Sequence, residues 1–132
     1  MRRLIMILAF TAIAAGCCYD IDEILLERED ISFTMKGEDL FKYNPLTCQM
    51  SYSSSDNTYR IYDDLLSDWI VMKCSSRPDT EGQELTVDLN WTASSSTRSE
   101  SDLQFTVQKT SEDGRIWLWN KSKRIGIVIK NL

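Results

Sequence analysis

Two groups of acidic residues are the first candidates for chemistry in this chain of 132 residues: Asp63, Asp64 and Asp68, and the pair Glu112 and Asp113. Paired carboxylates can act as acid and base across a sugar, and a cluster of them can bind calcium. Both groups fall where the pattern predicts turns, and a solvated turn explains acidic residues there. The chain also has no histidine, the commonest general base and zinc ligand. We therefore expect no enzyme activity, no metal site and no cofactor.

An aromatic pair is the more suggestive feature. In the segment Arg115–Asn120, Trp117 and Trp119 share one face of an extended strand, and Ile116 and Leu118 share the other. If the aliphatic face is core, the tryptophans form an exposed strip on which a sugar ring stacks or a partner protein packs. If the tryptophans are core, the aliphatic side chains lie outside or beneath a loop. Trp117 and Trp119 are thus the candidate ligand-binding residues, with both arrangements open.

Cysteines are the third group with chemistry. Cys48 and Cys74 both lie in β-like runs, and a bridge between them would stabilise the fold by restricting the unfolded chain. We predict a Cys48–Cys74 disulfide, with two buried free thiols as the alternative. Strand pairing decides between the two, because a disulfide needs Cα atoms within about 7 Å.

An all-β domain would have to position these residues. After residue 30 the sequence alternates with period two, is rich in Val, Ile, Thr, Tyr and Trp, and is interrupted by Ser, Asn, Asp and Gly clusters. We predict strands at 31–36, 47–53, 58–62, 69–74, 84–92, 103–110, 115–120 and 124–130. Residues 94–101 are predicted to be a polar loop. Two apolar faces of such strands would close into one antiparallel β-sandwich.

Alternation also predicts the buried side of these strands. The residues expected in the core are Leu85, Val87, Leu89, Trp91, Leu103, Phe105, Val107, Ile125, Ile127 and Ile129, with Trp69 as a further anchor.

The N-terminus has the pattern of a secretory signal peptide. Arg2 and Arg3 precede an apolar run that ends in the small residues Ala14, Ala15 and Gly16. This run is too short to cross a bilayer as a helix. Without residues 1–16 the chain keeps 13 basic and 20 acidic residues, a net charge of −7. That charge makes nucleic acid an improbable partner.

Residues 13–17, Ile-Ala-Ala-Gly-Cys, resemble the lipobox of bacterial lipoproteins. The resemblance implies that Cys17 receives a diacylglycerol and anchors the protein to a membrane. Asp20, Asp22 and Glu23 follow, and they resemble the export signal of surface lipoproteins in Bacteroides-like bacteria. A solvated tether explains the same residues, so a periplasmic and a cell-surface location both stay open.

A second resemblance covers about forty residues. Asp68-Trp69-Ile70, Asn90 and Arg98 stand where BACON domains of Bacteroidetes have comparable residues, and those domains are immunoglobulin-like sandwiches often attached to glycan-related proteins. The family's closing glutamine is missing here, where Lys130 and Asn131 stand instead.

These observations combine into one expectation. Residues 1–16 are a lipoprotein signal peptide, 17–30 an acidic tether or short helix, and 31–132 an immunoglobulin-like β-sandwich of about seven to eight strands. We expect a lipoprotein anchored to the outer membrane that acts as a non-enzymatic binding module, with glycan as the preferred ligand. A structural or accessory subunit of a protein assembly at the cell surface is the alternative.

Overall fold

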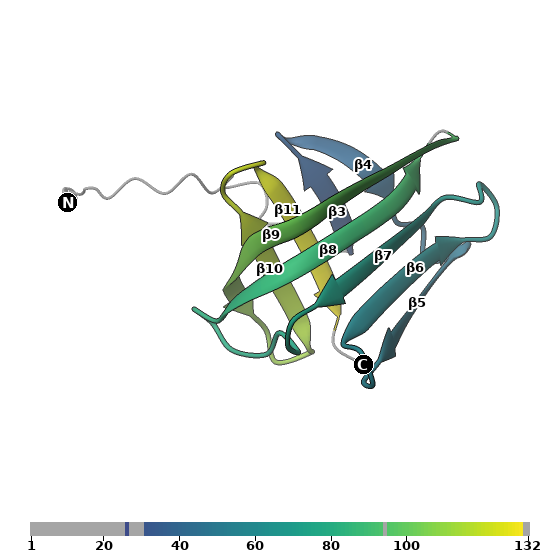
Figure 1. Cartoon of the computed structure of the whole chain (residues 1–132). Helices are drawn as coiled ribbons and strands as arrows, with labels where there is room; N and C mark the ends of the chain where they lie inside the picture. The colour runs from purple at the N-terminus through teal and green to yellow at the C-terminus, as the bar shows by residue number, and fades with distance from the viewer. Residues whose placement is uncertain (1–25, 27–30, 94, 131–132) are drawn as a thin grey trace, which may run out of the picture.

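The computed structural model describes residues 26, 31–93 and 95–130, and its strands form one antiparallel sheet. They are β3 (Ser32–Met35), β4 (Glu38–Lys42), β5 (Cys48–Ser53), β6 (Thr58–Asp63), β7 (Trp69–Cys74), β8 (Glu84–Ala93), β9 (Ser96–Thr110), β10 (Arg115–Asn120) and β11 (Ile125–Lys130). Their order across the sheet is β4-β3-β11-β10-β9-β8-β7-β6-β5 (Figure 1).

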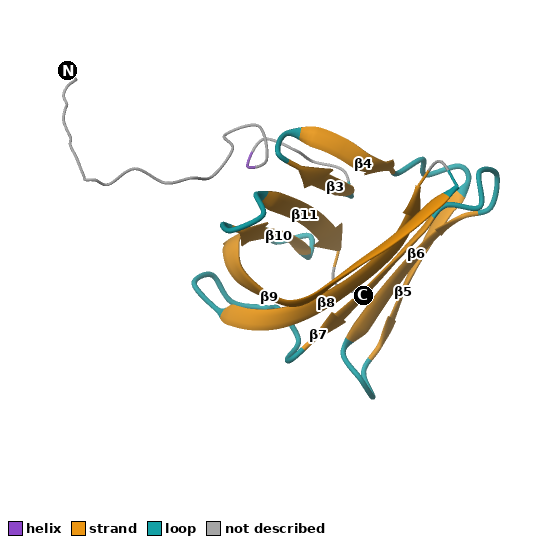
Figure 2. Ribbon diagram, turned by 45° about the horizontal axis from the view of Figure 1, so that its top comes forward, coloured by secondary structure: helices purple, strands orange, loops and turns teal. Residues whose placement is uncertain are grey.

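The sheet curls strongly, so that one of its faces lines the inside of a half-barrel (Figure 2). β4 and β5 follow each other in the chain, yet they are the two edge strands. Only residues 43–47 join them, and a chain of that length reaches at most about 20 Å. The two edges therefore approach each other at one corner.

The all-β prediction is confirmed, and each of the eight predicted segments contains a strand. The described strands belong to one continuous sheet, and in this respect the structure differs from the expected sandwich of two packed sheets. The predicted signal peptide, Cys17 and all of the predicted tether except residue 26 lie outside the described residues. Within the described part of the chain, no helix is long and apolar enough to cross a membrane.

Strand β4 is missing from the sequence prediction. Met35 pairs with Glu38 across a turn of two residues, Lys36 and Gly37, whose φ angles are 53° and 85°. Positive φ at both central positions is the geometry of the tight turn that suits a β-hairpin. β4 itself begins with two acidic residues, which are uncommon in strands, and this composition hid it.

The core fills the concave face of the sheet. It contains every core residue predicted from the alternation on β8, β9 and β11, together with buried side chains from β3 to β7 and from β10. The prediction of Trp69 as a further core anchor is wrong, because Trp69 is only partly buried and the next residue, Ile70, belongs to the core instead. Phe33 meets Trp91 edge to face, with ring centroids 5.2 Å apart and an interplanar angle of 84°. This contact ties β3 to β8 across the inside of the curl.

Candidate functional site

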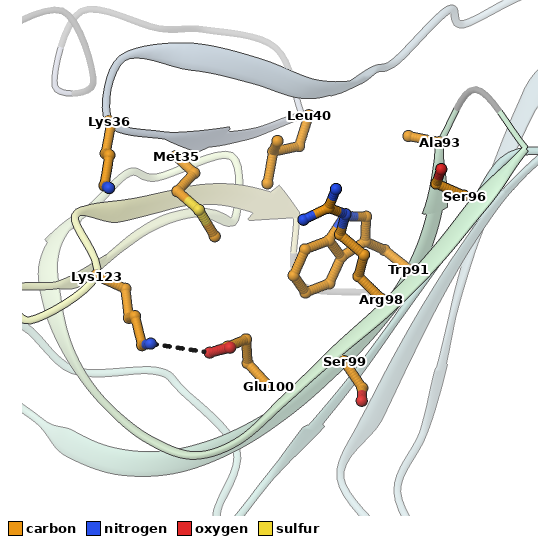
Figure 3. A pocket seen from close by; sticks show the side chains of 10 residues that line it. All are labelled: Met35, Lys36, Leu40, Trp91, Ala93, Ser96, Arg98, Ser99, Glu100 and Lys123. Carbon is orange, nitrogen blue, oxygen red and sulfur yellow. Dashed lines mark ion pairs between the residues drawn. The ribbon is translucent and has the colours of Figure 1, made fainter.

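A cavity of about 750 Å³ opens at one end of the concave face. It lies between the β3–β4 hairpin, the β8–β9 hairpin and the turn that joins β10 to β11 (Figure 3). The lining residues are Met35, Lys36, Leu40, Trp91, Ala93, Ser96, Arg98, Ser99, Glu100 and Lys123. Its volume falls in the range of pockets that hold small molecules.

A β-bulge in β9 brings charged residues to this face. Val87 pairs with Leu103, but two positions further along β8, Leu89 pairs with Glu100, so β9 holds one extra residue there. Asp102, in the bulge, has a φ of 57°. An extra residue reverses the alternation. The apolar side chains from Leu103 onward and the polar ones before the bulge therefore share the concave face.

Cross-strand pairing confirms which residues of β9 face the cavity. Trp91 stands opposite Arg98, and Ala93 stands opposite Ser96. Residues directly opposite on an antiparallel pair project to the same side of the sheet. Because Trp91 projects into the core, the side chain of Arg98 must project to the concave side as well.

The apolar part of the lining forms a firm floor. Trp91 is only 3% exposed and rests against Phe33. Met35 and Leu40 are partly buried and pack against the core beside it. An apolar ligand group entering the cavity would meet surfaces that are already ordered.

Of the four charged side chains that line the cavity, two form an ion pair and two have none within the described part of the chain. Lys123 Nζ lies 3.4 Å from Glu100 Oε2, which makes an ion pair. Arg98 and Lys36 are exposed, and within the described residues neither side chain has a hydrogen bond or an ion pair. With three cations and one anion, the lining carries a net charge of +2, although the whole chain carries −5.

Buried Asn120 holds the turn that carries Lys123. Its side-chain oxygen accepts a hydrogen bond from the Lys123 backbone N–H at 2.8 Å, and its amide nitrogen donates to the Gln104 carbonyl at 2.8 Å. Asn120 is 1% exposed, so these bonds satisfy an otherwise costly buried amide. The turn is thereby fastened to β9.

Trp117 and Trp119 do not lie in the cavity. They form a small cluster with Val128, separate from the main core, and they are 2% and 6% exposed. Lys109 Nζ lies 4.6 Å from the centre of the Trp117 ring. Because Ile116 and Leu118 are buried too, β10 is covered on both faces. The tryptophans therefore do not form the exposed aromatic strip considered above. The alternative, in which Ile116 and Leu118 lie outside the core, does not hold either.

The predicted disulfide is not formed: Cys48 and Cys74 are both buried free thiols. Cys48 pairs with Asp63 at one end of β6, whereas the Cys74 backbone N–H donates to the Asn57 carbonyl beyond the other end. The length of β6, about 17 Å at 3.3 Å per residue, separates them. Burial raises the pKa of the Cys74 thiol to about 12.

In each of the two acidic groups, one carboxylate binds an adjacent turn. Asp63 Oδ1 accepts hydrogen bonds from the backbone N–H groups of Leu65 and Leu66 at 2.9 and 3.1 Å. Asp113 accepts hydrogen bonds from the Ser111 hydroxyl and from Arg115 Nε, and these lower the pKa of Asp113 to about 2. In the described part of the chain, no group of histidine, cysteine or acidic side chains is arranged to hold a metal ion.

The cavity residues Lys36, Arg98, Glu100 and Lys123 were not predicted as a site from the sequence. Arg98 entered only through a family resemblance, and the segment around it is polar on both faces. The available signal was local: Arg98 and Glu100 stand two positions apart, a spacing that puts both on one side of a strand.

Comparison with known proteins adds no assignment: no family model matches the chain, and neither the curated proteins nor the solved structures contain a significant match.

Proposed function

We propose that this protein is a non-enzymatic binding module of the cell envelope and that the cavity is its ligand site. The observation that carries the proposal is the combination of an ordered apolar floor with Arg98 and Lys36, two cations that have no protein partner among the described residues. Lysine and arginine are mostly exposed in proteins, and these two side chains are exposed as well. Here they border a hollow of about 750 Å³.

The proposed anchor is Cys17. The lipobox-like segment supports lipidation, and several acyl chains on one residue would hold the domain firmly at a membrane. We propose the outer membrane, with the domain facing either the periplasm or the cell surface. A Cys17→Ser variant should be released from the membrane fraction or accumulate as a longer precursor. Unchanged membrane association of a processed variant would refute the lipid anchor.

The binding proposal is tested with two fluorescent dyes that share one ring system. N-phenyl-1-naphthylamine is neutral, and 8-anilinonaphthalene-1-sulfonate carries a sulfonate in addition. We expect at least one dye to bind the wild-type domain with raised emission. Ser96→Trp, which places a bulky side chain in the cavity, should abolish the signal. Thr97→Trp is the matched control, because its neighbouring exposed position is absent from the cavity lining.

The outcome decides the proposal. Binding by neither dye, or equal binding to Ser96→Trp and wild type, would overturn the assignment of the cavity as a ligand site. The resemblance to BACON domains supports glycan as a ligand class, so a glycan array belongs to the same test. A sugar retained by the wild type and lost by Ser96→Trp would identify a glycan ligand in this cavity.

A subunit of a surface assembly is the second candidate function, favoured by an exposed apolar patch. Leu46, Leu65 and Leu66 are 92%, 72% and 63% exposed. Their loops are joined, because the Asp64 backbone N–H donates to the Thr47 carbonyl at 3.0 Å. Exposed leucines grouped in this way suit a protein partner. A partner crosslinked stoichiometrically in native membranes should be lost when all three leucines are changed to serine, whereas crosslinking unaffected by that change would reject this candidate.

A further inference from the structure

We infer that the ligand of the cavity is an organic anion, with its acidic group paired with Arg98, further attracted by the charge of Lys36, and its apolar body packed against Trp91, Leu40 and Met35. This inference rests on the proposed function, since it names the ligand class of the same site. Three observations carry it: the local charge, the setting of Arg98, and the ordered apolar floor.

The local charge runs against that of the whole chain. An acidic protein would on average repel an anion, yet the cavity concentrates three of its basic side chains. Glu100 neutralises Lys123 at 3.4 Å. The remaining charge therefore resides on Arg98 and Lys36, which come from two hairpins far apart in the sequence. Arg98 and Lys36 line the same cavity from different sides, and their combined charge favours an anion there (Figure 3).

The place of Arg98 in the lining and the chemistry of its side chain suit an acidic group. Arg98 stands opposite Trp91 in the pairing of β8 with β9, and its side chain lines the cavity together with those of Trp91 and Leu40 (Figure 3). The guanidinium is always charged, so the hydrogen bonds that it donates to an anionic group are charge-assisted and stronger than those between neutral groups. The planar guanidinium can donate two parallel hydrogen bonds to a carboxylate, sulfonate or phosphate.

The apolar floor shows that the ligand is more than an inorganic ion. Trp91 is fixed by its contact with Phe33, and Leu40 and Met35 continue the same surface. A cavity of about 750 Å³ is far larger than one phosphate or sulfate needs. A molecule that carries both an acidic group and an apolar body, such as a fatty or aromatic acid, would match both parts of the lining.

The two naphthalene dyes separate this inference from the proposed function. The sulfonated dye should bind the wild-type domain about tenfold or more tightly than the neutral dye, because only its sulfonate can pair with Arg98. Arg98→Gln and Lys36→Gln should each weaken binding of the sulfonated dye and leave the neutral dye within twofold. Arg60→Gln is the matched control, because Arg60 is an exposed arginine on β6 outside the cavity. Circular dichroism would verify that each variant is folded.

Each result has one meaning. If the sulfonated dye has no advantage, or keeps its affinity in Arg98→Gln, the anion inference is wrong even though binding of the neutral dye would uphold the proposed function. Displacement of the sulfonated dye by inorganic phosphate at a similar concentration would also overturn it, since the site would then take a simple anion. Displacement by a fatty or aromatic carboxylate, at concentrations where phosphate has no effect, would support it.

Discussion

The two halves of β9 differ in their surroundings. The half from Leu103 onward packs into the core and is called the sealed half, and the half before the bulge borders the cavity and is called the open half. Leu103, Phe105 and Val107 are 5%, 0% and 1% exposed, and they lie in the middle of the core. Arg98 and Ser96 belong to the same strand and the same concave face, but they are exposed and border the cavity. A single extra residue in the strand separates the two halves.

This contrast shows how one strand can serve both stability and binding. In the sealed half, side chains from neighbouring strands exclude water, and burial of apolar surface supplies the free energy of folding. In the open half, the β3–β4 hairpin stands away from β9 and leaves a hollow in which polar groups stay solvated. Changes in the first half should therefore alter stability, and changes in the second half should alter ligand binding.

The largest expected effect is in the sealed half. Phe105→Ala should lower the free energy of unfolding by about 3–5 kcal/mol, because it removes a fully buried ring and leaves a void. Arg98→Ala should change it by less than about 0.5 kcal/mol, as is usual for exposed positions. Urea unfolding followed by circular dichroism measures both. Equal losses in the two variants would break the contrast. If Phe105→Ala fails to fold, Phe105→Leu gives a milder comparison.

A second effect depends on pH and on Cys74, which pairs with Val87 next to the sealed half. Burial raises the pKa of this thiol from 9.0 to about 12. The unfolded thiol ionises above pH 9 while the folded thiol does not, so stability is full below pH 9 and falls as pH rises towards 12. The loss should reach about 2 kcal/mol at pH 10.5.

Urea midpoints at pH 8 and pH 10.5, in the wild type and in Cys74→Ala, measure this effect. The pKa of buried Tyr59 is also raised, chiefly by burial and to a lesser extent by Cys74, so the comparison reports the thiol together with its smaller effect on Tyr59. The variant should lose less stability between the two pH values than the wild type. An equal loss would mean that Cys74 is not shielded from water.

Substitutions at Asp102, in the bulge, should have an intermediate effect on stability. Asp102 has a φ of 57°, a conformation that β-branched side chains adopt with difficulty. Asp102→Val should cost about 1–2 kcal/mol of stability, whereas Asp102→Gly should cost nothing or stabilise slightly. Both variants keep the backbone N–H that donates to Asp88 Oδ1 at 2.9 Å. Equal stabilities in urea unfolding would show that the bulge is not held in this conformation.

The smallest expected change in stability is in the open half. Glu100→Gln removes the ion pair with Lys123, whose side chain is 52% exposed, and such pairs contribute less than about 1 kcal/mol. The same change raises the charge of the cavity by one. The sulfonated dye should therefore bind about threefold more tightly, measured by fluorescence titration. Weaker binding would show that Glu100 contacts the ligand directly.

The sequence predicted most of the strands because their alternation is local and strong. Leu85 to Trp91 on β8 alternate between apolar and polar residues, and the structure buries the apolar set. The first half of β9 has no such signal. It faces solvent on one side and a cavity on the other, so neither side requires apolar residues, and the segment reads as a loop.

The candidate site could not be predicted for related reasons. Exposure of Trp117 and Trp119 depends on what covers the convex face of β10, which no spacing along the strand reveals. The pairing of Cys48 with Cys74 depends on the register of β5 and β7 against β6, and that register places the thiols at opposite ends. Which face of the sheet the Arg98 side chain occupies depends on the one extra residue in the bulge, because a shift of one position exchanges the two faces.

The amino-acid sequence by itself determined the all-β class, the positions of eight strands and the buried side of β8, of β11 and of β9 from Leu103 onward, because side-chain direction in a strand repeats every two residues. Only the tertiary structure decided that these strands join into one curled sheet. The curl accumulates from the twist between many strand pairs, and it brings Lys36 of one hairpin to the same opening as Arg98 of another. Long-range packing, rather than local pattern, created the cavity and its charge.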